Sequence, residues 1–515
     1  MIGPFKNEPV RQYKTEEERR ELKEAIAQWE GRFGQNYPLW VDGRKIETEK
    51  KHASINPSKT SEIIGYVSQA DRHIVDQAMA SAWEAFKTWS RVEPEARARV
   101  LLRAAGIMRR RRAELVAIEM LEAGKPVVEA DADVAEAIDF LEYYAREMVR
   151  LAHPPAPVQI PGESNEIRYI PLGVGVIIPP WNFPLAILTG MSSSAIVTGN
   201  TILLKPASNT PIIGSLFVEI MHQAGLPEGV IQFIPGSGSE IGDYLVDHPK
   251  TRFISFTGSK DVGLRIWQRA AVHQEGQKWL KRVVAEMGGK DAIIVDEDAD
   301  LDAAAEGIVI SAFGFQGQKC SAASRVIAVG SAYEPLLEKV LERTRKLTVG
   351  DPRDLDVDLG PIIDESQYRK ILDYIEVGKR EGKHLLGGER GPTDGYFIRP
   401  AIFGDVPPRA RIAQEEIFGP VLAFIRAKDF DEAIHIANDT DYGLTGAVYA
   451  RRMEHLEKAR AEFHVGNLYF NRKCTGALVG VQPFGGFNLS GTDAKAGGPD
   501  YLLNFLQMKS IAERL

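Results

Sequence analysis

The stretch GVIIPPWNFPLAILTGMSSSAIVTGNTILLK, residues 175–205, decides the fold of this 515-residue chain. It opens with a short apolar run that predicts a strand, continues over residues 185–198 with small residues that predict a helix, and closes with another apolar run that predicts a second strand. Farther along, residues 211–224 predict a helix, and residues 230–234 and 252–256 predict two more strands. Short apolar strands that alternate with helices are typical of an α/β fold with a parallel sheet covered on both faces.

A second alternating block runs from about residue 291 to residue 470. It contains predicted strands at residues 292–295 and 447–449 and a predicted helix at residues 301–313. This pattern predicts a second α/β domain. Residues 485–515 are rich in glycine and then mixed, which is typical of an arm rather than of a domain.

The part of the chain before residue 153 is mostly helical in pattern. Residues 15–30 predict a helix, residues 37–41 a strand, and residues 93–150 a long helical stretch with few breakers. A proline-rich link at residues 153–157 ends that stretch. Within it, the basic run at residues 109–112 predicts a solvated helix face.

The composition limits the classes of function. A chain of this length predicts roughly three domains, and its net charge of −8 argues against nucleic acid as the main partner. The uncharged segment at residues 169–204 is broken by prolines and glycines, which suits strands, turns and a small-residue helix better than a membrane span. The first residues lack the apolar core of a signal peptide, and two distant cysteines form no disulfide framework. We therefore expect a cytoplasmic protein.

Cys320 is the most informative single residue. It is one of two cysteines and lies among small and polar residues in FQGQKCS, residues 315–321, where a buried structural cysteine would have apolar neighbours. A thiol in such a setting can ionise and attack an electrophile, and the charge of Lys319 would favour the thiolate. The other cysteine, Cys474, is interpreted as incidental, and no spacing of cysteine or histidine suits a zinc site.

Two further side chains fit acyl chemistry on a carbonyl group. Glu286 closes an apolar run ahead of Gly288 and Gly289, and its carboxylate can activate water as a general base. A helix-capping or exposed glutamate is the plainer alternative. Asn182 lies in a turn between prolines, where its amide can stabilise an oxyanion. Ordinary turn chemistry is the alternative for this residue.

Two glycine-rich turns follow predicted strands. Residues 235–242, PGSGSEIG, come close to the dinucleotide fingerprint but carry one residue too many before the last glycine, and such turns are common in any α/β fold. After the next strand, Gly258 and Ser259 would open a helix whose backbone N–H groups can hold a phosphate. Lys205 ends a strand and is either a ligand for ribose hydroxyls or phosphate, or a surface lysine. Two such turns in succession favour nucleotide binding.

These pieces, in this order, resemble the NAD(P)-dependent aldehyde dehydrogenase superfamily from about Trp40 to the C-terminus. Seven ordered motifs carry the resemblance and are far more specific together than singly: PWNF at 180–183, KP at 205–206, FTGS at 256–259, EMGG at 286–289, QGQKC at 316–320, EIFGP at 416–420 and PFGG at 483–486. The resemblance implies a Rossmann-type nucleotide domain, a second α/β catalytic domain and a bridging region. The implied limits are residues 1–150 and 171–285 for NAD binding, 286–484 for catalysis, and 151–170 with 485–515 for bridging and oligomerisation.

The resemblance also implies a mechanism. Cys320, as a thiolate, would attack the aldehyde carbon, while the amide of Asn182 and the backbone N–H of Cys320 stabilise the oxyanion. After hydride transfer to the nicotinamide, Glu286 would activate water to hydrolyse the thioester on Cys320. The family pattern further implies a small-molecule substrate and at least a homodimer.

Family positions carry over to both binding sites. The residues that would bind NAD are Ile178, Pro179, Pro180, Trp181, Lys205, Ser208, Gly238, Gly242, Phe256, Thr257, Gly258, Ser259, Val262, Glu416 and Phe418. Those that would bind substrate are Phe183, Ser321, Gly476, Ala477 and Phe484. Ser208 stands where many NAD-selective relatives carry glutamate, and a serine would not repel the 2′-phosphate of NADP. We therefore expect NAD as cofactor, with NADP tolerated.

Three stretches resemble the branch of the superfamily that oxidises L-glutamate γ-semialdehyde, the hydrolysed form of 1-pyrroline-5-carboxylate, to L-glutamate in proline breakdown. They are FQGQKCSA at 315–322, TGA at 475–477 and SGTDAKAGGPDY at 490–501. No proline dehydrogenase region precedes them, so the single-function form is expected.

Four alternatives remain at this point. A dehydrogenase for another semialdehyde, such as succinate semialdehyde, is disfavoured by the carboxylate-binding turn at Gly476 and Ala477. A coenzyme A-acylating enzyme is disfavoured because Glu286 supplies a hydrolytic base. A thiol esterase would need no nucleotide, which the phosphate turns argue against. A non-catalytic protein with this fold would not need the intact set of Cys320, Glu286 and Asn182.

Overall fold

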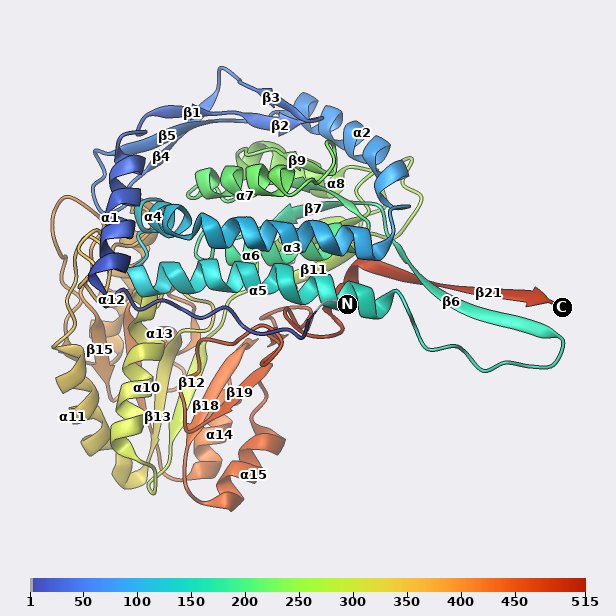
Figure 1. Ribbon diagram of the computed structural model, residues 1–515. Helices are drawn as coiled ribbons and strands as arrows, with labels where there is room; N and C mark the ends of the chain where they lie inside the picture. The colour runs from blue at the N-terminus through green and yellow to red at the C-terminus, as the bar shows by residue number, and fades with distance from the viewer. Residues whose placement is uncertain (1–2) are drawn as a thin grey trace.

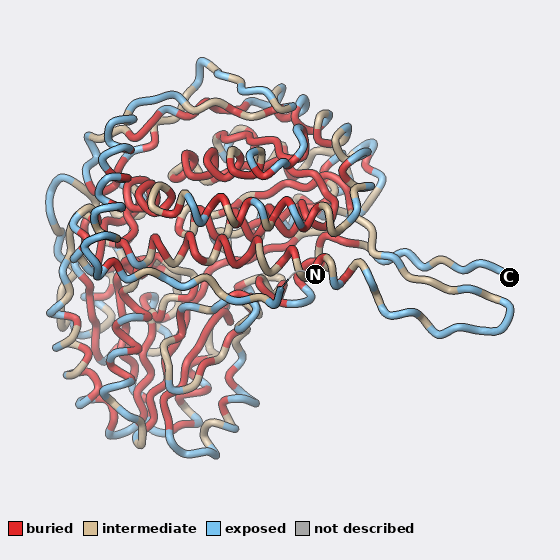
Figure 2. Tube along the Cα trace, viewed as in Figure 1, coloured by how far each residue is buried: buried red, intermediate tan, exposed pale blue. Residues whose placement is uncertain are grey.

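The structure is a computed structural model that describes residues 3–515 (Figure 1). Two lobes are each built around a seven-stranded sheet, and a long two-stranded arm projects from the side of the molecule. Buried residues fill the interior of both lobes, while the arm is largely exposed or half-buried (Figure 2). The predicted α/β fold is confirmed.

The first sheet has the strand order β11-β10-β7-β8-β9-β2-β3. Its strands from β11 to β9 run parallel, and β2 and β3 add an antiparallel edge. The strands are β2 (Leu39–Val41), β3 (Arg44–Ile46), β7 (Val174–Ile178), β8 (Thr201–Leu204), β9 (Ile231–Phe233), β10 (Phe253–Thr257) and β11 (Arg282–Glu286). All four strands predicted between residues 175 and 256 are present.

Helices cover both faces of this sheet, because successive side chains of a strand point to opposite faces. Ile177 packs into a core with residues of α3, α5, α6 and α7, whereas its neighbour Val176 packs with residues of α2 and α8. The helices are α2 (Arg72–Trp89), α3 (Pro94–Arg110), α4 (Arg112–Glu122), α5 (Val127–Leu151), α6 (Ala186–Val197), α7 (Pro211–Gln223), α8 (Asp243–Asp247) and α9 (Lys260–Ala270).

The second sheet has the order β14-β15-β16-β13-β12-β18-β19 and is parallel except for β14 at its edge. Ile293 packs with residues of α10 and α11 on one face, and Ile294 packs with residues of α12 and α14 on the other. The strands are β12 (Asp291–Val295), β13 (Ala323–Val329), β14 (Lys383–Leu386), β15 (Ala401–Gly404), β16 (Val421–Ala427), β18 (Thr445–Tyr449) and β19 (Asn467–Phe470). The helices are α10 (Leu301–Phe313), α11 (Tyr333–Thr344), α12 (Glu365–Glu381), α13 (Arg411–Gln414), α14 (Phe430–Asn438) and α15 (Met453–Glu462).

The N-terminal region contains one confirmed helix and one divided strand. α1 (Glu16–Glu30) begins at a capping box in which Thr15 and Glu18 satisfy each other's backbone N–H groups. The predicted strand at residues 37–41 is two strands, because Pro38 has no N–H to continue one hydrogen-bond ladder. β2 joins the first sheet, whereas β1 (Gln35–Tyr37) joins a three-stranded sheet with β4 (Lys51–Ile55) and β5 (Ile63–Ser68).

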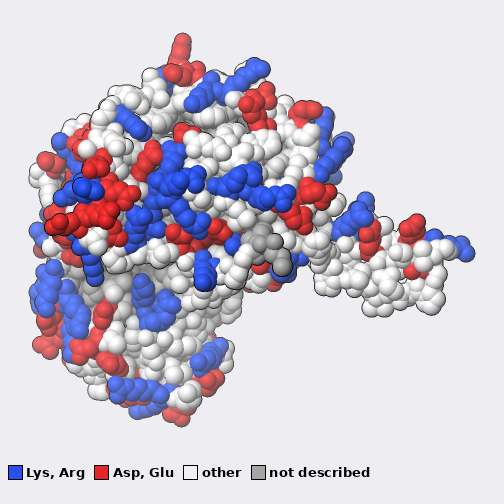
Figure 3. All heavy atoms as spheres, viewed as in Figure 1, with Lys and Arg blue, Asp and Glu red and all other residues white. Residues whose placement is uncertain are grey.

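The basic run at residues 109–112 is not the uniformly solvated helix face that was predicted. Arg112 is buried and pairs with Asp131 of α5 at 2.5 Å. Arg109 pairs with Glu8 and Glu142, each at 2.8 Å. Basic and acidic groups are interspersed over this face of the molecule (Figure 3). The local pattern could not predict this pairing, since the carboxylates come from distant parts of the chain.

The arm consists of β6 (Glu163–Pro171) and β21 (Leu506–Arg514), which pair antiparallel over their whole length. The C-terminus lies at its tip (Figure 1). A short pair, β17 (Tyr442–Gly443) with β20 (Phe487–Asn488), connects the C-terminal region to the second lobe. Within residues 3–515, the structure contains no helix with the length and apolar character needed to cross a membrane.

Candidate active site

The predicted site residues come from both lobes. In the first sheet, β7, β8, β10 and β11 end at one edge, as parallel strands do, and the turn after each strand carries predicted residues. In the second lobe, Cys320 lies just before β13 and Glu416 just before β16. Hydrogen bonds between the two sets, described below, bring them together at one place.

The chain takes an unusual path as it approaches Cys320. In the single turn η2 (Gly314–Gly317), the φ angles of Phe315, Gln316 and Gly317 are 50°, 57° and 68°. The left-handed region costs a non-glycine residue roughly 1–2 kcal/mol. Gln316 offsets this cost, because its buried amide donates to the carbonyl oxygens of Pro361 at 2.8 Å and Gly124 at 3.2 Å. The turn is therefore held in one conformation from outside.

Asn182 is attached to the same loop. Its Nδ2 donates to the carbonyl oxygen of Gln318 at 3.0 Å, and its side chain is buried. The side chain of Gln318 is itself fixed, since its Oε1 accepts from the N–H of Ile363 at 3.0 Å. One N–H of the Asn182 amide is thereby used to join the two loops, and the other has no hydrogen-bond partner among residues 3–515.

The surroundings of Cys320 favour the neutral thiol. Burial raises the pKa of the thiol well above its ordinary value, and the nearby carboxylates of Asp291 and Glu286 raise it further. The structure contradicts the expectation that Lys319 would favour the thiolate. Its ammonium group lies 2.7 Å from Glu129 of α5, so its charge is balanced by that carboxylate. A base would therefore have to remove the proton if Cys320 is the nucleophile, as predicted.

Glu286 lies at the end of β11 with only 9% of its surface exposed, which excludes the alternative of an exposed or helix-capping glutamate. Neither carboxylate oxygen has a hydrogen-bond partner among the described residues. Burial raises the pKa of this group well above its ordinary value. The C-terminal region packs over it: the N–H of Met287 donates to the carbonyl oxygen of Ser490 at 2.7 Å. At Gly491, a Cβ would lie 3.3 Å from both carboxylate oxygens, so glycine preserves space beside them.

The predicted phosphate and ribose ligands lie along the edge of the first sheet. Lys205 follows β8 and is buried, so it is not the surface lysine of the alternative interpretation. Burial lowers its pKa to about 8. Ser259 caps α9 by accepting from the N–H of Val262 at 3.5 Å. The N–H of Gly258 donates to the carbonyl oxygen of Glu286 at 3.1 Å, which places this turn beside the end of β11.

The other predicted cofactor residues of the first lobe lie in the same region of the sheet. They end β7 and β10 or follow β7 directly: Ile178, Phe256, Thr257, Pro179, Pro180 and Trp181. Gly238 and Gly242 begin and end a π-helical turn, η1 (Gly238–Gly242), after β9. Ser208 is half-buried and lies three residues after Lys205.

Glu416 and Phe418 extend this region into the second lobe. Oε1 of Glu416 accepts from the N–H of Gly289 at 3.0 Å. Phe418 has a left-handed φ of 60°, and its ring meets that of Trp181 edge-on with centroids 5.5 Å apart. A small cavity is lined by Glu416 and Phe418, and also by Gly289, Gly317 and Lys319 among others. Predicted cofactor residues of the two lobes are thus in contact.

The predicted substrate residues lie in loops of both lobes. Ser321 is buried, and its carbonyl oxygen accepts from Thr445 Oγ1 at 3.3 Å and from the Cys474 thiol at 3.5 Å. Cys474 thus packs beneath the loop without facing solvent. In the second lobe, the predicted carboxylate-binding turn has Gly476 at a left-handed φ of 74°. The remaining three residues, all half-buried, are Phe183, Ala477 and Phe484.

The model of the aldehyde dehydrogenase family matches residues 40–511. The chain belongs to this family. The sequence-based prediction of an aldehyde dehydrogenase is confirmed.

Three proteins illustrate the similarity. A 1-pyrroline-5-carboxylate dehydrogenase of Geobacillus sp. (strain WCH70) is 58% identical over 513 residues, covering 100% of both chains. The crystal structure of the 1-pyrroline-5-carboxylate dehydrogenase from Thermus with bound NAD superposes with a TM-score of 0.98 at 57% identity, again over 100% of both chains. Proline utilization A from Bdellovibrio bacteriovorus is 43% identical with a TM-score of 0.98, and the match covers 99% of this chain and 53% of that one.

Two residues of this aldehyde dehydrogenase site were given no role from the sequence. Gln318 supplies the carbonyl oxygen that holds Asn182. Lys125 lies between α4 and α5 and donates to the carbonyl oxygen of Asn182 at 3.0 Å. Gln318 lies in the QGQKC motif, which gave it no role, and Lys125 lies in none of the motifs above. Only the folded chain brings both residues to the site.

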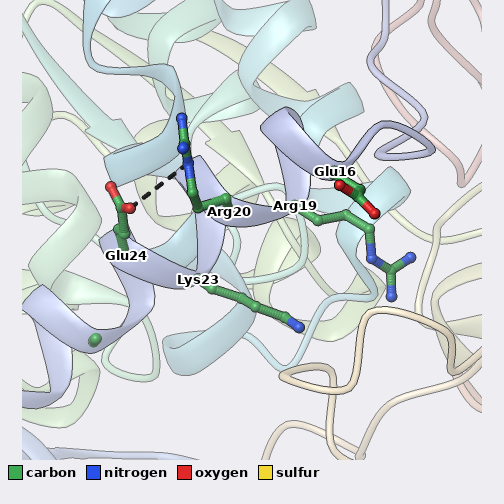
Figure 4. A pocket seen from close by; sticks show the side chains of 6 residues that line it. Glu16, Arg19, Arg20, Lys23 and Glu24 are labelled. Atoms are coloured by element: carbon green, nitrogen blue, oxygen red, sulfur yellow. Dashed lines mark ion pairs between the residues drawn. The ribbon is translucent and has the colours of Figure 1, made fainter.

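A surface hollow along α1 does not belong to the site (Figure 4). Its lining residues are Glu16, Arg19, Arg20, Lys23, Glu24 and Ala27. The charges of Arg19 and Arg20 are balanced by Asp356 and Glu24, respectively. None of the predicted site residues lines this hollow.

Proposed function

We propose that this chain oxidises L-glutamate γ-semialdehyde to L-glutamate with NAD as the oxidant. The observation that carries the proposal is the attachment of the Asn182 amide to the loop of Cys320, at the edge where the unpartnered carboxylate of Glu286 also lies. The full-length relatives named 1-pyrroline-5-carboxylate dehydrogenase support the substrate, and the NAD-bound Thermus structure supports the cofactor.

In the first half-reaction, Cys320 forms the covalent intermediate. Its thiol loses a proton to Glu286, the sulfur bonds to the aldehyde carbon, and the carbonyl electrons move to the oxygen. The free N–H of Asn182 and the backbone N–H of Cys320 stabilise this oxyanion. NAD, when bound, accepts the hydride that leaves this carbon as the C=O bond re-forms. The aldehyde carbon, oxidised by two electrons, remains on Cys320 as a thioester.

In the second half-reaction, Glu286 acts on water. After the proton taken from the thiol has passed to solvent, its carboxylate takes a proton from a water molecule as the oxygen of that water bonds to the thioester carbon. The C–S bond breaks, the carboxylic acid is released, and Cys320 is left as a free thiolate. The buried, unpartnered carboxylate suits this role, since no other group of the described chain occupies its lone pairs.

The substrate positions suit a chain with a carboxylate at its far end. We assign the α-carboxylate to the hydroxyl of Ser321 and the backbone N–H groups of Gly476 and Ala477, since a hydroxyl and turn N–H groups bind carboxylates well. Phe183 and Phe484 would flank the aliphatic stem. The left-handed φ of Gly476, which few other residues adopt, supports the assignment of a backbone-lined turn.

The substrate is tested by following NADH formation with three aldehydes. L-Glutamate γ-semialdehyde is expected to give a kcat/KM at least ~10-fold above that of succinate semialdehyde and of a simple aliphatic aldehyde, because a site built to bind a polar group discriminates against substrates that lack it. Equal rates would overturn the carboxylate-turn assignment but keep the dehydrogenase. No reduction of NAD with any aldehyde would overturn the proposed function.

Lys205→Met is predicted to weaken NAD binding. Methionine has no ammonium group to donate hydrogen bonds to the ribose. Hydrogen bonds to charged groups contribute about 1.5–3 kcal/mol, or roughly 10- to 100-fold in Kd. Titration of intrinsic fluorescence with NAD measures the change. An unchanged Kd would remove Lys205 from the cofactor site, and circular dichroism checks that the variant is folded.

Ser208→Glu is predicted to separate the two cofactors. A carboxylate there would repel the 2′-phosphate of NADP, and a like-charge contact costs several kcal/mol, so kcat/KM with NADP should fall by on the order of 100-fold. The value with NAD should change little. Ser208→Gln, of the same size without the charge, is the control; an equal loss with this variant would attribute the effect to bulk.

We also propose the division into an NAD-binding domain, a catalytic domain and a bridging region at the limits given above, in a cytoplasmic homo-oligomer. The separate sheets of residues 39–286 and 291–470 support the first two domains. The β6–β21 arm supports the third, since each strand has one edge without a partner strand among residues 3–515. Light scattering after size-exclusion chromatography tests the oligomer, and a monomer at all concentrations would contradict it.

A further inference from the structure

Lys125 is a fully buried cation that contacts the site without belonging to the reacting groups. Its Nζ lies 2.6 Å from Asp133 Oδ2 and 3.6 Å from Glu119 Oε2. It also donates to the main-chain carbonyl oxygen of Asn182 at 3.0 Å. The other carboxylate oxygen of Asp133 accepts from the N–H of Ala186 at 2.6 Å, at the start of α6. The turn that carries Asn182 is therefore fastened at both ends to the same buried pair.

The same ammonium group contacts two aromatic rings. It lies 4.2 Å from the ring centre of Phe183 and 4.8 Å from that of Phe315. A cation over a ring face at these distances is attracted by the π electrons, and more strongly when both are desolvated. Phe183 follows Asn182 in the chain, and Phe315 opens the left-handed turn that leads to Cys320. Lys125 thus connects the oxyanion loop with the nucleophile loop.

The charges around Lys125 keep it protonated. Burial alone would lower the pKa of its ammonium, but Asp133 and Glu119 outweigh burial and raise that pKa. Burial and the neighbouring Asp133 raise the pKa of Glu119 well above its ordinary value. Asp133, at 2.6 Å, is the nearest carboxylate to the ammonium, and the ammonium must stay near it, because a buried unpaired charge is costly.

We propose that Lys125 is a positioning residue for the oxyanion hole. Through the Asn182 carbonyl and the rings of Phe183 and Phe315, it fixes the Asn182 amide relative to Cys320. This role rests on the proposed function, in which that amide stabilises the oxyanion. Lys125 itself would touch neither the aldehyde nor the cofactor, so its effect would reach the reaction through Asn182 and the two loops.

The first test is the variant Lys125→Met, which keeps the length of the side chain and removes its charge. It is expected to lower kcat by roughly 10- to 100-fold, since a shift of about 1 Å in a positioning group costs up to 100-fold. The Kd for NAD should stay within about threefold, because no cofactor residue is touched. The matched control is Arg112→Met, which breaks another buried ion pair with a residue of α5, Asp131. The side chain of Arg112 makes no hydrogen bond to Asn182 among residues 3–515. Arg112→Met should lower the Tm comparably and leave kcat within about threefold.

The second test is a double-mutant cycle with Asn182→Ala. If Lys125 acts through Asn182, Lys125→Met should lower kcat by less than about threefold in the Asn182→Ala background. A full and multiplicative loss there would overturn the proposal, as would equal effects of Lys125→Met and Arg112→Met on kcat. If Lys125→Met does not fold, Asp133→Asn, which weakens the hold on the ammonium but retains an acceptor for Ala186, is read in the same cycle. Absence of NADH formation by the unmodified protein would instead overturn the proposed function itself.

Discussion

Cys320→Ala is expected to abolish aldehyde oxidation, with kcat reduced on the order of 10⁴-fold or more, as when other covalent nucleophiles are removed. Alanine cannot form the thiohemiacetal, so no hydride can leave and no thioester can form. NADH formation with L-glutamate γ-semialdehyde measures the loss. The Kd for NAD should be retained, which separates loss of chemistry from loss of the fold.

The chain supplies a matched control for this variant. Cys474 is the only other cysteine and is buried beneath the same loop, where its thiol donates to the Ser321 carbonyl. Cys474→Ala removes a thiol of equal size and is expected to keep kcat within about tenfold. A Cys320→Ala variant that retained most of its activity, or a larger loss at Cys474, would contradict the assignment of the nucleophile.

Glu286→Gln is expected to lower turnover strongly, because the same carboxylate removes the thiol proton and later activates water. Glutamine has nearly the same shape but cannot take a proton from water, so kcat should fall about 10²- to 10⁴-fold. If the thioester still forms, one equivalent of NADH should appear rapidly per active site and then stop. Rapid mixing measures that burst, and mass spectrometry of the quenched protein should find the acyl group on Cys320.

A second buried carboxyl tests whether the effect is specific. Glu122 is buried, accepts from the N–H groups of Ile212 and Ile213, and has its pKa raised to about 7 by burial. Glu122→Gln should lower stability but leave kcat within about tenfold. If Glu286→Gln gave no burst, the same carboxylate would be needed before hydride transfer, which agrees with its role in removing the thiol proton. Full activity of Glu286→Gln would contradict both roles.

The pH dependence follows from the same two groups. Glu286 acts as its carboxylate and Cys320 as its thiolate, and burial raises the pKa of both. Activity must therefore rise with pH, and its acidic limb must lie well above the ordinary pKa of a glutamate. The pH profile of kcat/KM checks this sign. A flat profile down to pH values near an ordinary glutamate pKa would contradict it.

The sequence predicted the scaffold well where local signals are strong. The helix at residues 301–313 coincides with α10 because Asp300 caps it and the residues that follow are good helix formers. The positions of Cys320, Glu286 and Asn182 relative to predicted strands were also clear, since each follows or precedes an apolar run. These features depend on neighbours in sequence.

The features that the sequence did not predict depend on distant partners. Arg112 was expected in solvent because its pairing with Asp131 requires two helices to pack. Lys319 was expected to act on the thiol, but Glu129 of α5 lies opposite it only in the folded chain. The left-handed turn at Phe315 and Gln316 had no signal either, since neither residue favours that conformation.

The packing of the C-terminal region over Glu286 has a consequence for synthesis. Ribosomes deliver the chain from the N-terminus, and domains generally fold as units in that order. Both seven-stranded sheets end by residue 470, yet Ser490 and Gly491, which pack against the end of β11, and β21, which pairs with β6, emerge later. A nascent chain can therefore hold a folded nucleophile loop while its general base still lacks cover. The site is therefore complete only after the last residues have been synthesised and have packed against strands made much earlier.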